Sequence, residues 1–109
     1  MSLVTTHVLD TAAGRPAAGI PVTLSRVGAG GQPERVAAAV TDADGRARDL
    51  GPEELAAGTY QLTFDLTDRP EPAASFFPEI VIRFVLDSSR HWHVPVLLSP
   101  FSYTTYLGS

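Results

Sequence analysis

HWHVPVLLSPFSYTTYLGS, residues 91–109, holds two of the three histidines in the chain. In a β-strand successive side chains point to opposite faces, so one face of this stretch is wholly apolar. That face consists of Trp92, Val94, Val96 and Leu98. The other face carries His91, His93, Pro95, Leu97 and Ser99. A half-exposed strand normally shows Lys, Thr or Glu there, so we expect the first face in the core and the second face covered by another protein layer.

Short alternating or β-branched segments, separated by Gly- and Pro-rich turns, recur along the rest of the chain. They are residues 3–9, 20–27, 35–41, 59–66, 79–86 and 102–107. The segments 3–9 and 20–27 flank a Gly/Pro turn region, a pattern that predicts a hairpin. Seven or eight such strands predict an all-β antiparallel sandwich or barrel, formed by a single domain over residues 1–109.

Two further segments are not strand-like. PEELAAG, residues 52–58, begins with Pro, carries two Glu in its first turn and ends at Gly58, which predicts one short helix. DRPEPAAS, residues 68–75, is rich in Pro and polar residues and predicts a loop.

Composition excludes several classes of function. The net charge is −4 and every one of the eight basic residues is Arg, so the chain has no basic field for nucleic acid. No apolar run is long enough to cross a membrane, and residues 1–10 lack the features of a signal peptide. The chain contains no Cys, which fits a reducing compartment. We therefore expect a cytoplasmic protein that binds neither nucleic acid nor membrane.

The histidines are the first candidates for chemistry. His91 and His93 leave the same strand face roughly 6.5 to 7 Å apart, and His7 lies on another strand beside Leu9. Such a set can transfer protons, or it can bind zinc through a His-x-His pair and a distant His. The neighbours of the histidines include no carboxylate that would orient them as metal ligands. We favour a metal-free site without cofactors, with a His₃ zinc hydrolase as a minor alternative.

A fourth candidate follows a tight turn. Asp42-Ala-Asp-Gly45 places a Gly where a turn needs positive φ, and Arg46 leaves that turn directly. The turn thus orients Arg46, although the sequence alone does not identify the group that Arg46 contacts.

Four stretches in this order resemble the transthyretin-like 5-hydroxyisourate hydrolases. They are THVLDTAAGRPAAGIPVTL, TDADGR, FFPEIVIRF and HWHVPVLLSPFSYTTYLGS, and together they extend over nearly the whole chain. The combination of His-aromatic-His-Val-Pro, Leu-Leu-Ser-Pro and a closing Tyr-x-Gly-Ser is specific. The resemblance implies a transthyretin-like sandwich.

It also implies an activity. The family hydrolyses 5-hydroxyisourate, the product of urate oxidation, to 2-oxo-4-hydroxy-4-carboxy-5-ureidoimidazoline, without metal or organic cofactor. The family's catalytic residues fall on His7, Arg46 and His93. Proton transfer by the two histidines and binding of substrate oxygens by the arginine suit their chemistry. Which histidine is the base stays open. The residues that the resemblance places around the substrate are His91, Thr104, Tyr106 and Ser109.

The resemblance also implies a homotetramer, a dimer of dimers. The covering layer on the histidine face would then be another subunit. In that arrangement the interface between dimers is lined by His7, Leu9, His93, Pro95, Leu97, Thr104 and Tyr106.

One position departs from the family pattern. The closing tetrapeptide is usually Tyr-Arg-Gly-Ser, whereas this chain has Leu107 in place of the Arg. Losing a cation at this point favours the main alternative, a carrier of the same fold that holds a flat ligand without chemistry. The joint presence of His7, Arg46 and His93 favours the enzyme, because a carrier has no need of proton-transfer groups. A purely structural sandwich is the weakest alternative.

Overall fold

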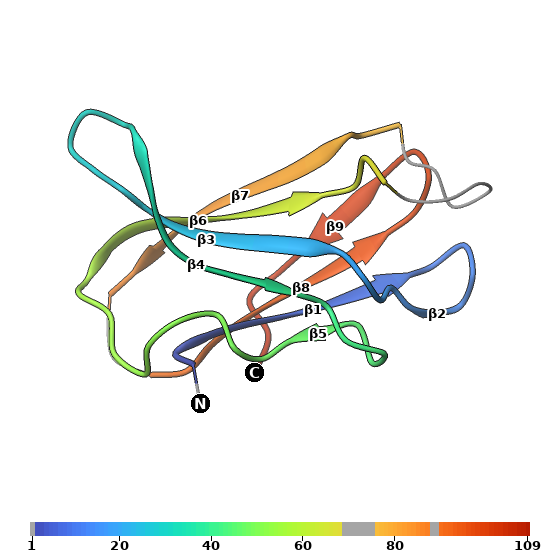
Figure 1. Cartoon of the computed structure of the whole chain (residues 1–109), viewed down its shortest axis with the longest axis horizontal. Coiled ribbons are helices and arrows are strands. Elements are labelled where there is room, and N and C mark those ends of the chain that lie inside the picture. The colour runs from blue at the N-terminus through green and yellow to red at the C-terminus, as the bar shows by residue number, and fades with distance from the viewer. Residues whose placement is uncertain (1, 69–75, 88–89) are drawn as a thin grey trace.

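The computed structural model describes residues 2–68, 76–87 and 90–109 (Figure 1). Nine strands lie within these ranges: β1 Val4–Asp10, β2 Arg15–Pro16, β3 Pro21–Val27, β4 Pro33–Val40, β5 Arg46–Ala47, β6 Gly58–Asp65, β7 Glu79–Leu86, β8 Trp92–Leu98 and β9 Tyr103–Thr105. All six predicted strand segments, and the strand at residues 91–99, are present. Residues 69–75 of the predicted loop lie outside the described residues.

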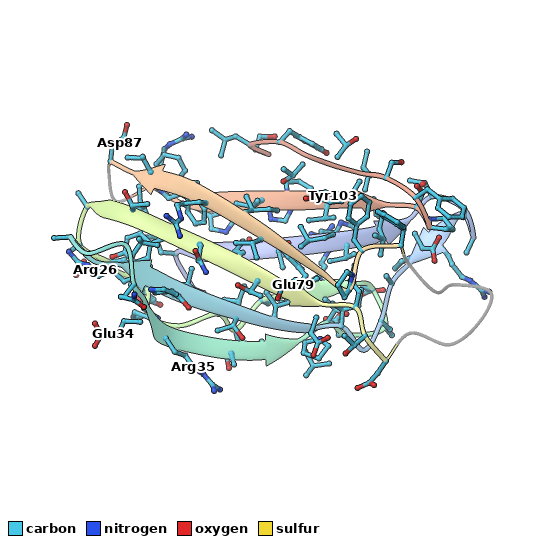
Figure 2. The ribbon with its side chains drawn as sticks, turned by 90° about the horizontal axis from the view of Figure 1, so that it is seen from above. Arg26, Glu34, Arg35, Glu79, Asp87 and Tyr103 are labelled. Atoms are coloured by element: carbon cyan, nitrogen blue, oxygen red, sulfur yellow. The ribbon has the colours of Figure 1, made fainter. Side chains whose placement is uncertain are left out.

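The strands form two sheets that pack face to face. One sheet has the order β2-β1-β8-β9, with β5 also pairing β1, and the other has the order β4-β3-β6-β7. The first sheet carries the histidines on its outer face. Figure 2 shows the two sheets as layers, with Glu34 and Arg35 of β4 pointing away from the sandwich. The predicted all-β sandwich is therefore confirmed.

The predicted hairpin between residues 3–9 and 20–27 is wrong, because β1 and β3 belong to different sheets. The ten residues between them contain β2 and are long enough to cross from one sheet to the other, whereas hairpin loops are usually two to five residues. β1 instead pairs in parallel with β8, with Thr5 opposite His93 and His7 opposite Pro95. Among the strands that the structure describes, the other pairs are antiparallel.

The predicted helix at residues 52–58 is also wrong. Residues 52–57 form an irregular segment, and Gly58 already begins β6. A helix this short is costly to nucleate, and its backbone groups have other partners. The Pro52 carbonyl accepts from the Leu3 N–H at 3.0 Å, and the Ala56 carbonyl accepts from the Tyr60 hydroxyl at 2.7 Å. Within the described ranges the structure has no helix suited to crossing a membrane.

The core lies between the sheets and takes one face of each of the long central strands β1, β3, β6 and β8. Trp92, Val94, Val96 and Leu98 are all buried, as the alternation in β8 predicts. Val4 and Val8 of β1 are buried on the same side. Because β1 and β8 put their apolar side chains inward, the side chains between them point outward. This register places Thr5, His7 and His93 on the outer face of the sheet.

Candidate active site

A turn held by one carboxylate aims Arg46. The Gly45 N–H donates to the Asp42 carbonyl at 2.8 Å, and Asp42 Oδ1 accepts from the N–H groups of Asp44 at 2.9 Å and Arg46 at 3.1 Å. The bond from the Arg46 N–H is the main cause that holds the pKa of Asp42 below its usual value. Asp42 Oδ2 also accepts from Arg48 Nη1 at 3.0 Å. The Asp42 carboxylate thus holds the turn together and also binds the segment that follows it, through the Arg46 N–H and the Arg48 side chain.

Gly45 brings this turn against β1. Its φ is +75°, which side-chain-bearing residues rarely adopt, and a Cβ there would collide with the Val8 carbonyl oxygen. The Val8 N–H donates to the Gly45 carbonyl at 2.7 Å. Immediately beyond, Arg46 pairs with His7 across β1 and β5. The predicted residues His7 and Arg46 are therefore direct neighbours on the outer face.

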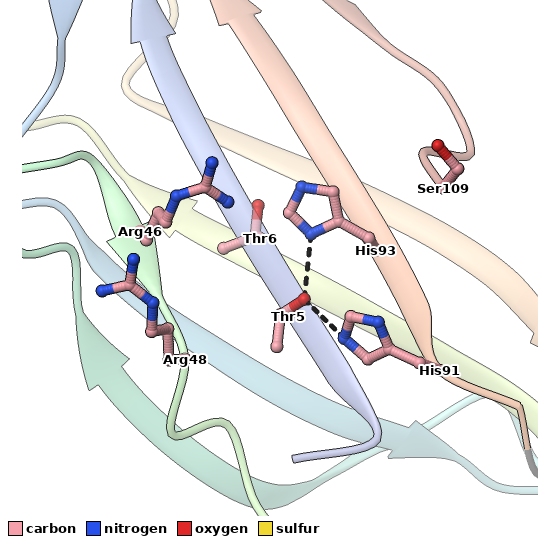
Figure 3. A pocket seen from close by; sticks show the side chains of 7 residues that line it. All are labelled: Thr5, Thr6, Arg46, Arg48, His91, His93 and Ser109. Atoms are coloured by element: carbon pink, nitrogen blue, oxygen red, sulfur yellow. Dashed lines mark hydrogen bonds between the residues drawn. The ribbon is translucent and has the colours of Figure 1, made fainter. Parts of the chain in front are cut away.

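The two histidines of β8 share one threonine. Thr5 Oγ1 lies 2.9 Å from His91 Nε2 and 2.9 Å from His93 Nδ1 (Figure 3). The two imidazole rings are stacked, with centroids 6.3 Å apart and planes at 25°. Thr5 is buried and His93 is half-buried, whereas His91 is exposed. The Thr5 hydroxyl therefore ties both rings to β1.

The C-terminal tail closes the site on its far side. Gly108 forms a bridge with His93, and its N–H donates to the His93 carbonyl at 2.8 Å. This contact carries Ser109 to the pocket. Both ends of the described chain thus contribute to one site.

A pocket of about 280 Å³ lies among these elements. Figure 3 shows the side chains that line it, which are Thr5, Thr6, Arg46, Arg48, His91, His93 and Ser109. Four residues expected in the site, Arg46, His91, His93 and Ser109, meet there. His7 is not part of this lining, although its charge acts on His93.

Sequence reasoning missed Thr5, Thr6 and Arg48. Thr5 shares a strand face with His7, and Arg48 follows Arg46 by one alternation around the buried Ala47. Those patterns indicate the two residues once the site is located on this face. Thr6 gives no such signal, since its hydroxyl donates inward to the Val94 carbonyl.

The charge state of His93 follows from its surroundings. Burial of the ring is the main cause that lowers the pKa of His93 below its usual value, and the charges of Arg46, His91 and His7 lower it further. A hydrogen bond with the backbone of Thr5 acts in the opposite direction. A histidine with a lowered pKa is neutral at neutral pH, as a general base must be.

Two expected binding residues lie elsewhere in the single chain. Thr104 is exposed and pairs with Leu97 on the histidine face, beyond the pocket. Tyr106 lines a second hollow of about 260 Å³, which is apolar and includes Leu107. Leu107, which departs from the family pattern, is thus absent from the lining of the histidine pocket.

The histidines are also candidate metal ligands. Among the residues that the structure describes, no three His, Asp or Glu side chains are grouped closely enough to hold a metal ion. The stacked rings of His91 and His93 each direct one nitrogen at Thr5 Oγ1, and not at a common point where a metal ion could lie.

Known proteins resemble this chain over its whole length. Residues 4–108 match the model of the HIUase/Transthyretin family. The 5-hydroxyisourate hydrolase of Caulobacter vibrioides is 46% identical, and the match covers 100% of both chains. The solved structure of Klebsiella pneumoniae 5-hydroxyisourate hydrolase has 37% identity and a TM-score of 0.81, covering 97% of this chain and 98% of that one.

A solved transthyretin is equally close in shape. Transthyretin from Sparus aurata is 30% identical with a TM-score of 0.87, and the match covers 99% of this chain and 97% of that one. A 5-hydroxyisourate hydrolase and a transthyretin therefore share this architecture, so the fold alone does not assign an activity. By its sequence and its sandwich alike, this chain belongs to the HIUase/transthyretin family.

Proposed function

We propose that this protein hydrolyses 5-hydroxyisourate in urate degradation, without metal or organic cofactor. The observation that carries the proposal is the pocket itself, in which a histidine with a lowered pKa lies beside the Arg46 guanidinium and the C-terminal serine. Relatives of 40 to 46% identity over nearly the whole chain bear the name 5-hydroxyisourate hydrolase.

The residues divide the reaction between them. Water adds to a ring carbonyl carbon, the carbon–nitrogen bond of the ring breaks, and the leaving nitrogen takes up a proton. His93, neutral at neutral pH, removes the proton from the water. Arg46 donates to the oxygen on which charge develops, because a guanidinium is a rigid donor that cannot act as a base. His7, next to Arg46, supplies the proton to the leaving nitrogen.

The binding roles proposed for the remaining residues follow their positions. Ser109 and His91 line the pocket and contact the substrate there. Thr104 lies on the outer face that another subunit would cover, and Tyr106 lines the apolar hollow, so both would contribute only in the assembled tetramer.

Assembly as a dimer of dimers would cover the outer face. His7, Leu9 and Leu97 are only half-buried in the single chain, and Leu9 lies opposite Leu97 in the β1–β8 pair. A continuous apolar strip beside a polar pocket is typical of a surface covered by another subunit. We place this assembly in the cytoplasm, which the lack of Cys fits.

The carrier remains the second candidate, and the likeness to transthyretin favours it. A solved sea bream transthyretin in complex with thyroxine has 30% identity and a TM-score of 0.85. Against a carrier stands the lowered pKa of His93 beside Arg46, an arrangement that ligand storage does not require.

The deciding experiment follows the decay of freshly generated 5-hydroxyisourate by absorbance. The protein should accelerate this decay well above the spontaneous rate, before and after dialysis against a strong chelator. His7→Ala, Arg46→Ala and His93→Ala should each lower kcat/KM by about 100-fold, as expected for a lost proton-transfer group or oxyanion donor. Decay at the spontaneous rate would establish the carrier instead, and activity restored only by zinc would establish the metal site.

A further inference from the structure

The Thr5 hydroxyl stands between two imidazole nitrogens and has a single proton. It lies 2.9 Å from His91 Nε2 and 2.9 Å from His93 Nδ1 (Figure 3). A hydroxyl can donate only one hydrogen bond, whereas it can accept others. When both rings are neutral, at most one of the two nitrogens can accept the Thr5 proton, and the other must then carry its own proton and donate to the hydroxyl oxygen. The tautomers of His91 and His93 are coupled through Thr5.

The surroundings of His93 select one of the two arrangements. The other ring nitrogen of His93, Nε2, points away from Thr5 on the side of the pocket where Arg46 lies (Figure 3). A guanidinium offers only donors and a positive charge, so it favours a lone pair on the ring edge that faces it. After burial, the positive charge of Arg46 is the next cause that lowers the pKa of His93, so a cation acts on this ring. Arg48 is the other charged side chain that lines the pocket.

His91 offers no competing preference. It is exposed, so water can satisfy its second nitrogen in either tautomer. Thr5 is buried and held by the β1–β8 pairing, opposite His93, so its hydroxyl cannot turn to solvent. The surroundings of His93 therefore decide which of the two tautomer arrangements forms.

We propose that Thr5 is a positioning residue that keeps the proton of neutral His93 on Nδ1 and leaves Nε2 as a lone pair facing the pocket. His91 serves as the acceptor of the Thr5 hydroxyl proton, which frees the Thr5 oxygen to receive His93 Nδ1–H. The tautomer stands on hydrogen-bond geometry alone, whereas its catalytic meaning rests on the proposed function. There it identifies the atom that takes the proton from water as His93 Nε2.

Two substitutions separate the hydroxyl from the fold. Thr5→Val keeps the β-branched shape that suits a buried strand position and removes only the hydroxyl. Thr5→Ser keeps the hydroxyl and serves as the matched control. The thermal unfolding midpoint of each variant shows whether the sandwich is intact.

The first readout is the ¹⁵N NMR spectrum of the histidine side chains, at a pH where the rings are neutral. In the wild type and in Thr5→Ser, we expect Nδ1 to carry the proton in both His91 and His93. In Thr5→Val the spectrum should show His93 as a mixture of tautomers. A proton on His93 Nε2 in the wild type would overturn the proposal, whether or not the protein is a hydrolase.

The second readout is the steady-state kinetics of 5-hydroxyisourate hydrolysis. Thr5→Val should lower kcat by about 10-fold or more with little change in KM, and Thr5→Ser should restore most of the loss. Wild-type kinetics in Thr5→Val would refute the positioning role. An inactive wild type would refute the proposed function and leave the NMR result to decide the tautomer.

Discussion

Gly108 packs directly on the ring of His93. A Cβ at Gly108 would lie 2.9 Å from His93 Cδ2 and 3.1 Å from Pro95 Cγ, closer than such atoms normally approach. Thr5 holds the same ring from the other side, so the ring cannot simply turn away. We therefore expect Gly108→Ala to displace either His93 or the tail and to lower kcat/KM by about 10- to 100-fold, as small misplacements of catalytic groups do.

Gly30→Ala is the matched control for this substitution. Gly30 has no positive φ, and a Cβ there meets nothing within 4 Å. Its variant should keep full activity in the same assay. Equal activities of the two variants would show that the tail yields without disturbing His93.

The turn before Arg46 predicts a difference in stability between two glycine substitutions. Gly45→Ala must adopt a φ of +75° and collide with the Val8 carbonyl, whereas Gly31→Ala at φ +78° meets nothing within 4 Å. Gly31→Ala should cost about 1 kcal/mol of unfolding free energy for its backbone conformation alone. Gly45→Ala should cost about 2–4 kcal/mol, because overpacking is added. Urea unfolding of both variants measures the difference. Similar midpoints would show that the turn can shift away from β1 without a loss of stability.

The acid limb of activity should depend on Arg46. His93 must be neutral to act as a base, so activity falls as the pH drops through its pKa, which lies below the usual value. Arg46→Gln removes a cation that lowers this pKa, and the pKa should rise. The acid limb of the remaining activity should therefore move to higher pH. Arg48→Gln is the control, because Arg48 is not among the causes of the shift, and its limb should stay in place.

A charged residue introduced on the outer face tests the proposed dimer of dimers. Leu97 lies opposite both Leu9 and Thr104, in the centre of the surface that a dimer of dimers would bury. Leu97→Glu would leave an unpaired carboxylate in that contact, and the tetramer should dissociate to dimers. Sedimentation measured beside turnover tests this expectation. A fully active dimer would show that each site is complete within one subunit.

The sequence predicted those features that depend on alternation within one strand. The buried face of β8 and the outward histidines follow from a period of two, and the Asp-Gly turn before Arg46 follows from local backbone chemistry. His91, His93 and Arg46 could therefore be assigned to an outward face or an aimed position before the fold was known. His7 was a candidate from its own strand, and the resemblance to a family added Ser109.

Features that depend on which strands meet were not predictable in the same way. Alternation gives each strand a face but no partner, so the parallel pairing of β1 with β8 could not be deduced, and the expected β1–β3 hairpin is wrong. Thr5 matters only through that pairing, since His93 lies 88 residues away in the chain. The helix prediction at residues 52–58 failed because local propensity was outweighed by backbone bonds to Leu3 and Tyr60.

The parallel pairing of β1 with β8 also has a consequence for biosynthesis. β1 leaves the ribosome well before residues 92–98, its neighbour on one side, because β8 follows it late in the sequence. Until then the apolar side chains of β1 lack half of their sheet, and such distant pairing slows folding. Nascent chains that stop before β8 would carry Thr5 and Arg46 but no imidazole on β8 to meet them. In a translation mixture, turnover of 5-hydroxyisourate would therefore come only from molecules whose synthesis has continued past β8.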